Sequence, residues 1–306
     1  MKTAINQKLL IIRGQKKRNK VKLGSFLFIL PAVALNLIFF IYPFLQTLRM
    51  SFYEWPLMGE KTYLGLSNFT QIFLDGQFWT SFWFTAKYTL MVTPLIFIIA
   101  FSLALLINKR LPGVAFFRAV YFAPVVISMV SSALVWLWIY NDLYGVLNYY
   151  LLNLGIVNDP ILWMGHASTS LPAISFMITW KMAGFTMIIL LAGLQSIPTE
   201  TYEAASIDGA STLKKILYIT IPMLKPSIGL ALIVSVIGSV LGFEQFLIMT
   251  GGGPSNTTTT IVHYIYNQSF KYFHFGYGSA MTVILLIVLV VLSYIQLRVL
   301  RNPADQ

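Results

Sequence analysis

The segment from Gln195 to Pro226 reads Gln-Ser-Ile-Pro-Thr-Glu-Thr-Tyr-Glu-Ala-Ala-Ser-Ile-Asp-Gly-Ala-Ser-Thr-Leu-Lys-Lys-Ile-Leu-Tyr-Ile-Thr-Ile-Pro-Met-Leu-Lys-Pro. It is the least apolar stretch in the core of the chain, and it separates two long apolar blocks. Pro198 and Thr199 favour a helix start, Asp208 and Gly209 favour a turn, and residues 213–219 favour a second short helix before Pro222. The pattern predicts a helix, a turn and a helix that lie beside a membrane.

Apolar blocks of about 20 residues flank this segment, and 20 helical residues are long enough to cross a hydrocarbon layer of about 30 Å. Apolar residues make up 57% of the 306 residues and charged residues 10%, against roughly 25% in an ordinary soluble domain. Lipid offers no hydrogen bonds to the backbone, so each block is expected to be a helix. The sequence predicts an all-α, polytopic membrane protein with six transmembrane helices, near 24–48, 84–107, 118–140, 171–194, 227–249 and 277–298.

Basic residues are distributed unevenly between the two sides of these spans. If the N-terminus is cytoplasmic, sixteen of the 21 lysines and arginines fall on the inner side, as expected of a membrane protein. We therefore predict a basic cytoplasmic tail (1–22), a permease domain (23–306) with the 195–226 segment in the cytoplasm, and a cytoplasmic C-terminus. The first block is too long for a signal-peptide core, so it is expected to remain as a helix.

The tail could instead be an arm that binds RNA. It contains eight basic residues, but no aromatic residues are interleaved with them for stacking on bases. We therefore expect it to set membrane topology and predict no nucleic-acid partner. The tryptophans near the predicted outer ends of the spans agree with this topology, because indole rings favour the lipid headgroup region. Prolines within the spans, among them Pro124 and Pro172, predict kinks or breaks.

The chain has few of the residues that catalysis or cofactor binding requires. It has no cysteine and no Gly-x-x-x-x-Gly-Lys-Ser/Thr sequence for nucleotide phosphates. Its three histidines, His166, His263 and His274, do not have metal-ligand spacing, and no catalytic triad or carboxylate pair is evident. We expect no enzyme activity, no cofactor and no metal, and any ATPase that drives the chain must be a separate protein.

Two charged residues lie inside predicted spans. Lys181 falls in the fourth span and Glu244 in the outer half of the fifth. A charge in the bilayer centre costs about 2.5–3.5 kcal/mol on insertion scales and usually faces a cavity or a partner. Both are therefore candidates for contact with a hydroxylated or charged solute. The alternatives are that the two side chains pair with each other or extend toward the membrane surface.

The quoted segment resembles the signature of permease subunits of binding-protein-dependent ABC importers, which is Glu-Ala-Ala, three residues, Gly, nine residues and Ile-x-Leu-Pro. The chain matches it with 203–205, Gly209 and 219–222, and departs from it at Ile221, where leucine is usual. The resemblance implies the type I permease fold and a coupling helix that docks on an ATPase subunit, with Glu203 and Gly209 as central contacts. The implied coupling residues are Tyr202, Glu203, Ala204, Ala205, Asp208, Gly209, Ala210 and Pro222.

A second stretch, 243–254, is similar to the Phe-Asp-x-Ile-x-x-Leu-Thr-x-Gly-Gly-Pro sequence of the carbohydrate branch, in particular the maltose, lactose and glycerol-phosphate "first" permeases. The resemblance implies a sugar, oligosaccharide or polyol as solute. The implied substrate pathway includes Lys181, Met182, Phe185, Gly238, Leu241 and Glu244. The chain departs from the maltose type at 238–241, where a serine stands in place of amides, so maltose specificity is not implied.

The resemblance also implies partners and a mechanism. A second, homologous permease, a cytoplasmic ABC ATPase dimer and an extracytoplasmic solute-binding protein are expected, with the chain in a bacterial plasma membrane and working by alternating access. Three alternatives remain open: a secondary transporter, an ABC permease for a solute other than a sugar, and a membrane-bound enzyme. A secondary transporter would be expected to have inverted repeats and more buried acids.

Overall fold

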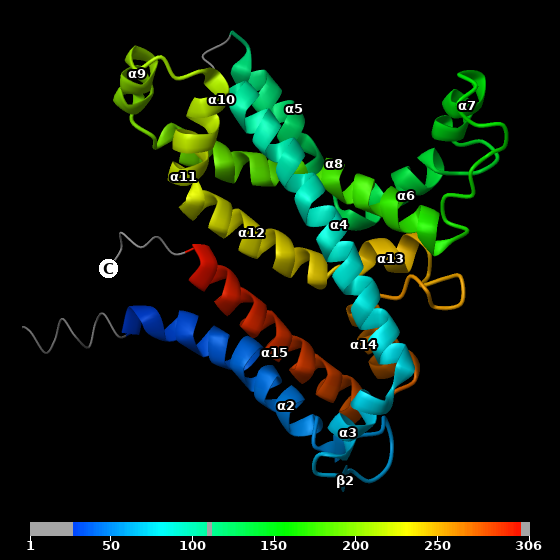
Figure 1. Ribbon diagram of the computed structural model, residues 1–306. Coiled ribbons are helices and arrows are strands. Elements are labelled where there is room, and N and C mark those ends of the chain that lie inside the picture. The colour runs from blue at the N-terminus through cyan, green and yellow to red at the C-terminus, as the bar shows by residue number, and fades with distance from the viewer. Residues whose placement is uncertain (1–26, 109–111, 301–306) are drawn as a thin grey trace, which may run out of the picture.

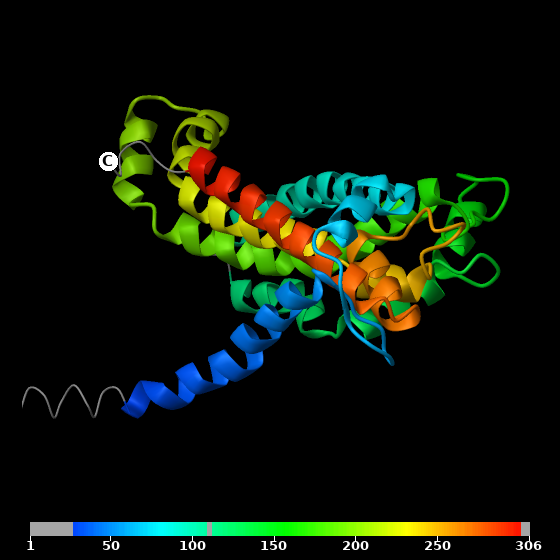
Figure 2. The ribbon, with the colours of Figure 1, turned by 90° about the horizontal axis from the view of Figure 1, so that it is seen from below.

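The structure is a computed structural model that describes residues 27–108 and 112–300. The predicted basic tail, 1–22, lies outside the described residues. Figures 1 and 2 show a bundle of long helices with short helices and loops at its ends. The all-α prediction is confirmed, with one addition: a small antiparallel ribbon of β1 (Tyr53–Glu54) and β2 (Thr62–Tyr63) that the sequence did not indicate.

Five helical segments are long and apolar enough to cross a membrane. They are Leu27–Met50, which contains the π-helical turn η1 (Leu37–Ile41) and α2 (Tyr42–Met50); α4 (Gly76–Ile107); α8 (Ala167–Gln195); Lys225–Met249; and α15 (Phe275–Leu300). They coincide with five of the predicted blocks. The helix α4 begins eight residues before the predicted block, because Asp75 caps it by accepting hydrogen bonds from the amides of Gln77 and Phe78.

The third predicted span is not one helix. It consists of α5 (Val114–Val126) and α6 (Met129–Ile139), which are bent by 96° relative to each other. The prediction of six spans therefore holds only if this bent pair counts as one span. Pro124 cannot donate a backbone hydrogen bond in the last turn of α5, and Ser128 starts α6 by accepting from the amide of Ser131.

The core of the bundle is built on the long contact between α4 and α8, to which α5 and α12 (Lys225–Val240) add further faces. Buried alanines, among them Ala100, Ala104 and Ala183, let the helices approach closely, as is common in membrane bundles. The first span is different, because none of its apolar window is buried within the chain. It contacts α15 at its Met50 end and diverges from the bundle toward Leu27 (Figure 2).

The two ends of the bundle carry different elements. One end carries α9 (Thr199–Ile207), α10 (Thr212–Lys215), the π-helical turn η2 (Ile216–Thr220) and α11 (Ile221–Met223) (Figure 1). The other end carries the β-ribbon, α3 (Ser67–Leu74), α14 (Ile261–Tyr266) and the π-helical turn η3 (Asn267–Lys271). The short helix α7 (Val146–Asn153) follows α6 and is also distant from α9.

Gly184 sets the crossing of α8 and α5. A Cβ atom at this position would lie 2.1 Å from the carbonyl oxygen of Tyr121. We expect Gly184→Ala to push the two helices apart and lower the free energy of unfolding by about 1–3 kcal/mol, the usual range for overpacking. Thermal unfolding of the purified chain in detergent measures this change.

Gly238→Ala is the matched control for this substitution, because a Cβ atom at Gly238 would have no neighbour within 4 Å among residues 27–108 and 112–300. Equal melting temperatures for the two variants would show that the α5–α8 contact does not limit stability.

Candidate functional site

A cavity of about 530 Å³ lies in the middle of the bundle, where two helices break. Val125 and Met129 line it on either side of the break between α5 and α6. Leu241, Gly242 and Phe243 line it at the break between α12 and α13 (Glu244–Met249). Irregular backbone at membrane depth is tolerated where it is buried in protein or lines a cavity, so the two breaks mark this space as a candidate solute site.

Gly242 allows the break in the fifth span to pack closely. A Cβ atom there would lie 2.6 Å from Nε2 of Gln245 and 3.2 Å from Cε1 of Tyr88. The carbonyl oxygen of Gly242 accepts a hydrogen bond from Oγ1 of Thr260, at 2.9 Å, which satisfies a backbone group that the broken helix leaves free. The break is therefore supported by its neighbours on α4 and on the segment before α14.

The cavity wall is mostly apolar and aromatic, with a small set of polar groups, as is usual for small-molecule sites. Phe185 and Phe243 are the phenylalanines of this wall among the described residues, and Phe243 also packs on Tyr266, with ring centroids 5.0 Å apart. The polar groups are Tyr88, Thr186, Ser235, Ser239, Glu244 and Gln245. Gln245 donates from Nε2 to the Tyr88 hydroxyl at 3.2 Å, which fixes the orientation of its amide. Such a wall can stack on a ring and hydrogen-bond to hydroxyl groups.

The structure brings five of the six predicted substrate-pathway residues to this cavity: Met182, Phe185, Gly238, Leu241 and Glu244. Lys181 is not among the lining residues. Trp180, the residue before Lys181 in α8, packs on Trp136 of α6, with ring centroids 5.7 Å apart. The residues that sequence reasoning missed include Tyr88 and Gln245. They lie 157 positions apart, and only their packing brings them together.

Lys181 extends to the break between α5 and α6. Its side chain is 3% exposed, and Nζ donates to the carbonyl oxygen of Pro124 at 3.1 Å and to that of Ile127. Both carbonyls belong to the end of α5, where helical partners are missing. Among the described residues, no ion pair joins Lys181 to Glu244. The lysine therefore satisfies the broken helix, which is neither of the two alternatives that the sequence left open, pairing with Glu244 or reaching the membrane surface.

The segment between α8 and α12 forms the predicted helix, turn and helix. At the end of α9 the amide of Gly209 donates to the carbonyl of Ser206 at 3.1 Å, and the amide of Ala210 donates to that of Ala205 at 2.9 Å. This pair of bonds is a Schellman motif, in which the residue after the cap is left-handed. Gly209 has φ +75°, which explains why glycine stands four residues after Ala205.

Two side-chain contacts fasten α9 to the base of the bundle. The hydroxyls of Tyr202 and Thr220 are 3.0 Å apart, and Nζ of Lys215 donates to Oγ of Ser206 at 2.6 Å. The helix buries none of its own residues, and Ile207 is 87% exposed. Glu203, Ala204, Asp208 and Gly209 are also exposed, while Tyr202, Ala205 and Ala210 are half-buried. Pro222 is exposed at α11. The helix is thus held at one side and open at the other.

The family of the chain follows from a match that covers most of its helices. Residues 81–302 match the family described as "Binding-protein-dependent transport system inner membrane component". The chain belongs to this family of transport permeases. The resemblance read from the coupling segment is therefore confirmed, and the family name places such permeases in the inner membrane. The resemblance of 243–254 to carbohydrate permeases is confirmed by relatives that are sugar transport system permeases.

Relatives and a solved structure agree with the family. The permease is 36% identical to the arabinooligosaccharides transport system permease protein AraP of Bacillus subtilis, over 90% of this chain and 88% of the relative. It is 34% identical to the trehalose/maltose transport system permease protein MalF of Thermococcus litoralis, over 96% and 99%. A bacterial alginate ABC transporter in complex with an alginate pentasaccharide-bound periplasmic protein contains a chain of the same fold, with a TM-score of 0.82 and 24% identity over 93% and 96%.

Proposed function

We propose that this permease is the transmembrane subunit of an ATP-driven importer that translocates a sugar, an oligosaccharide or a related polyol. The single observation that carries this proposal is the central cavity of a family member, whose lining combines the aromatic residues Phe185 and Phe243 with hydroxyl and amide groups. The transport systems named for the relatives AraP and MalF carry arabinooligosaccharides and trehalose or maltose, which supports the carbohydrate class.

The permease works with partners. A second, homologous permease completes the solute pathway, since the first span buries none of its apolar window within this chain. An ABC ATPase dimer grips the exposed side of α9 in the cytoplasm, with Glu203 and Gly209 as central contacts and Tyr202, Ala204, Ala205, Asp208, Ala210 and Pro222 around them. A solute-binding protein delivers solute at the opposite, outer end. Both termini of the permease then lie in the cytoplasm.

The mechanism is alternating access. Closure of the ATPase dimer moves α9, and the contacts of Tyr202 with Thr220 and of Lys215 with Ser206 pass this movement to the base of α12. Because α12 ends at the cavity, its displacement changes the shape of the solute site and opens it toward the outer side. ATP hydrolysis reverses the movement. The permease itself contributes no catalytic residue.

The charge of the cavity limits the solute class. Glu244 is the charged side chain among the described residues that line it, while the amine of Lys181 is engaged by backbone carbonyls. A second negative charge about 4 Å from Glu244 would be repelled by about 4 kcal/mol at an effective dielectric constant of 20. The ammonium of Lys181 offsets part of this repulsion, because hydrogen bonds to carbonyls leave its charge in place. The remaining repulsion favours an uncharged carbohydrate.

Uptake by proteoliposomes tests the function. The permease is reconstituted with its partner permease and ATPase, and the external binding protein is added with radiolabelled trehalose or arabinotriose. ATP supplied to the ATPase is expected to drive accumulation, and omission of the ATPase is expected to abolish it. Accumulation without the ATPase would favour a secondary transporter, and chemical conversion of the solute without transport would favour a membrane-bound enzyme. ATP-driven uptake of amino acids alone would indicate a different solute class.

Glu244→Gln is predicted to change the charge preference of uptake. Removal of the carboxylate should leave uptake of trehalose within about threefold, and should raise uptake of a glucuronic-acid disaccharide about tenfold, which corresponds to about 1.4 kcal/mol. Asp159→Asn is the matched control, because this exposed acid lies outside the cavity. An unchanged ratio of the two uptake rates in Glu244→Gln would contradict the assignment of Glu244 to the pathway.

A further inference from the structure

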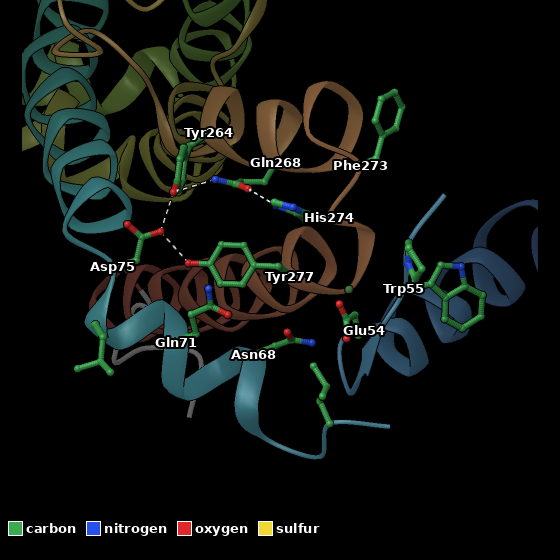
Figure 3. Close-up of a pocket in the computed structure, with 14 residues that line it drawn as sticks. Glu54, Trp55, Asn68, Gln71, Asp75, Tyr264, Gln268, Phe273, His274 and Tyr277 are labelled. Atoms are coloured by element: carbon green, nitrogen blue, oxygen red, sulfur yellow. Dashed lines mark hydrogen bonds between the residues drawn. The ribbon is translucent and has the colours of Figure 1, made fainter. Parts of the chain in front are cut away.

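A second cavity lies at the end of the bundle opposite α9. Its volume is about 660 Å³, within the range of small-molecule sites. Figure 3 shows its lining residues converging from the β-ribbon, α3, the start of α4, α14, η3 and the start of α15. Gly276 lets α15 begin close against the ribbon, since a Cβ atom there would lie 1.9 Å from the carbonyl oxygen of Tyr53. We call this space the outer pocket.

Asp75 holds one wall of the outer pocket in place. Its Oδ2 accepts from the hydroxyls of Tyr264, at 2.6 Å, and Tyr277, at 2.7 Å (Figure 3). Its Oδ1 accepts from the amides of Gln77 and Phe78. Burial alone would raise the pKa of Asp75, but these four hydrogen bonds lower it below its ordinary value. The carboxylate is fully engaged, so it serves as framework.

A chain of hydrogen bonds extends this framework from Tyr264 to His274. Nε2 of Gln268 donates to the Tyr264 hydroxyl at 3.0 Å, and Oε1 of Gln268 is 3.1 Å from Nδ1 of His274. Nδ2 of Asn68 donates to the carbonyls of Ser51 and Tyr53, which fixes its amide as well. The wall is therefore preorganised before any ligand binds.

Other polar groups of the outer pocket have no partner within the described part of the chain. They are the carboxylate of Glu54, the amide of Gln71, Nε2 of His274 and Oδ1 of Asn68. Glu54 and Asn68 lie near each other in Figure 3, and Trp55 stands next to them. The ammonium of Lys61 lies 3.9 Å from the centre of the Trp55 ring, which fixes the indole in place.

We propose that the outer pocket is a second carbohydrate-binding site, which takes one or two rings of an uncharged sugar before the sugar enters the central cavity. The proposal rests on the proposed function for its outward orientation and for the solute class. Sugar hydroxyls both donate and accept hydrogen bonds, and the free carboxylate, amide and imidazole groups match them from several sides. Lys61 covers one face of the Trp55 ring, and the face that Lys61 leaves uncovered would supply the apolar surface on which a sugar ring packs.

The charge of the outer pocket selects among ligands. Glu54 and Asp75 are negative, and the described residues that line the pocket include no lysine or arginine. The ammonium of Lys61 lies beside the pocket, over the Trp55 ring, but two carboxylates outnumber this one cation, so an anionic sugar would meet net repulsion. The same selection for uncharged solutes operates at Glu244 in the central cavity, so both sites favour one solute class. The alternative occupant is a divalent cation held by Glu54. Competition between Ca²⁺ and trehalose for the pocket distinguishes the cation from the sugar.

The test uses the full chain with its partner subunits in lipid nanodiscs, and a variant that blocks the central cavity. Gly238→Trp is chosen to fill that cavity, because Gly238 lines it and a Cβ atom there would meet no described atom within 4 Å. Equilibrium dialysis with radiolabelled trehalose is expected to give two sites per permease for the natural sequence and one for Gly238→Trp. Adding Glu54→Gln and Trp55→Ala to Gly238→Trp should weaken the remaining site at least tenfold.

Glu60→Gln in the same Gly238→Trp background is the matched control, since Glu60 is an exposed acid near the β-ribbon that does not line the outer pocket. It should leave trehalose binding unchanged. Absence of binding to Gly238→Trp, equal loss with Glu60→Gln, or competitive displacement of trehalose by Ca²⁺ would each overturn the proposal. If proteoliposomes that contain the natural sequence still accumulate trehalose in those cases, the proposed function is supported and the outer site is rejected. Binding to Gly238→Trp without any ATP-driven uptake by the natural sequence would support the outer site and overturn the proposed function.

Discussion

ATP-driven uptake is expected to fall to background when Glu203 is changed to lysine, and again when Gly209 is changed to valine. Glu203 is exposed on α9, where charge reversal would oppose docking of the ATPase. Gly209 has φ +75°, and a β-branched residue in this left-handed conformation costs at least about 1–2 kcal/mol. Within the described part of the chain, no atom beyond its chain neighbours lies within 4 Å of a Cβ added to Gly209, so valine acts on the backbone of the turn and on the docking surface.

Gly155→Val is the matched control for Gly209→Val. Gly155 has φ +66°, ends α7 with the same pair of hydrogen bonds and also has open space around it, but it lies away from the coupling segment. Uptake by proteoliposomes, membrane insertion, solute binding and copurification of the ATPase are measured for all variants. Insertion and solute binding should be retained throughout. Normal uptake by Glu203→Lys, or equal loss in Gly155→Val, would remove the support for a coupling role.

Lys181→Met is expected to reduce uptake about tenfold or more and to lower stability by about 1–3 kcal/mol for each carbonyl that loses its donor. The carbonyls of Pro124 and Ile127 stand at the 96° bend, and Lys181 supplies hydrogen to both. Without the amine, the end of α5 changes position, and with it Val125 and Met129 in the cavity wall. Uptake and thermal unfolding of the reconstituted complex measure the two effects.

Solute preference separates a positioning role of Lys181 from direct contact with solute. If Lys181 acts through the bend, Lys181→Met leaves the ratio of trehalose uptake to glucuronic-acid disaccharide uptake unchanged, although both rates fall. Lys87→Met is the control, because Lys87 lies within the α4 span but is exposed. A selective loss of the anionic solute in Lys181→Met would mean that the amine reaches the pathway.

Sequence reasoning was successful where the physical signal is local. The length and apolar character of 171–194 and 277–298 predict α8 and α15, because a segment in lipid must satisfy its own backbone hydrogen bonds, as a helix does. Gly209 identifies the end of α9 for an equally local reason, since the turn needs a left-handed residue. Pro124 indicated a break in the third span, but the size of the bend depends on contacts that α5 and α6 make with α8.

The sites depend on contacts between distant residues, and these could be predicted only in part. A lysine inside a span implies a partner, but hydropathy cannot tell whether that partner is Glu244, a solute or the carbonyls of a broken helix. Family resemblance predicted four residues of the cavity wall: Met182, Phe185, Gly238 and Leu241. Only the packing in the structure identified their neighbours Tyr88 and Gln245. The outer pocket joins Asp75 to Tyr277 over 202 positions, and no periodic pattern encodes such a contact.

The carboxylate of Asp75, which accepts four hydrogen bonds between α4 and the outer helices, also has a consequence for stability in acid. Its folded-state pKa lies below 3.8, so its contribution to stability is complete above the unfolded value and disappears only as the surroundings acidify through the lower, folded value. At a pH equal to the unfolded value an ordinary surface aspartate is half protonated, whereas Asp75 would still be mostly ionised. The hydrogen bonds that join α4 to Tyr264 and Tyr277 would therefore persist at that pH.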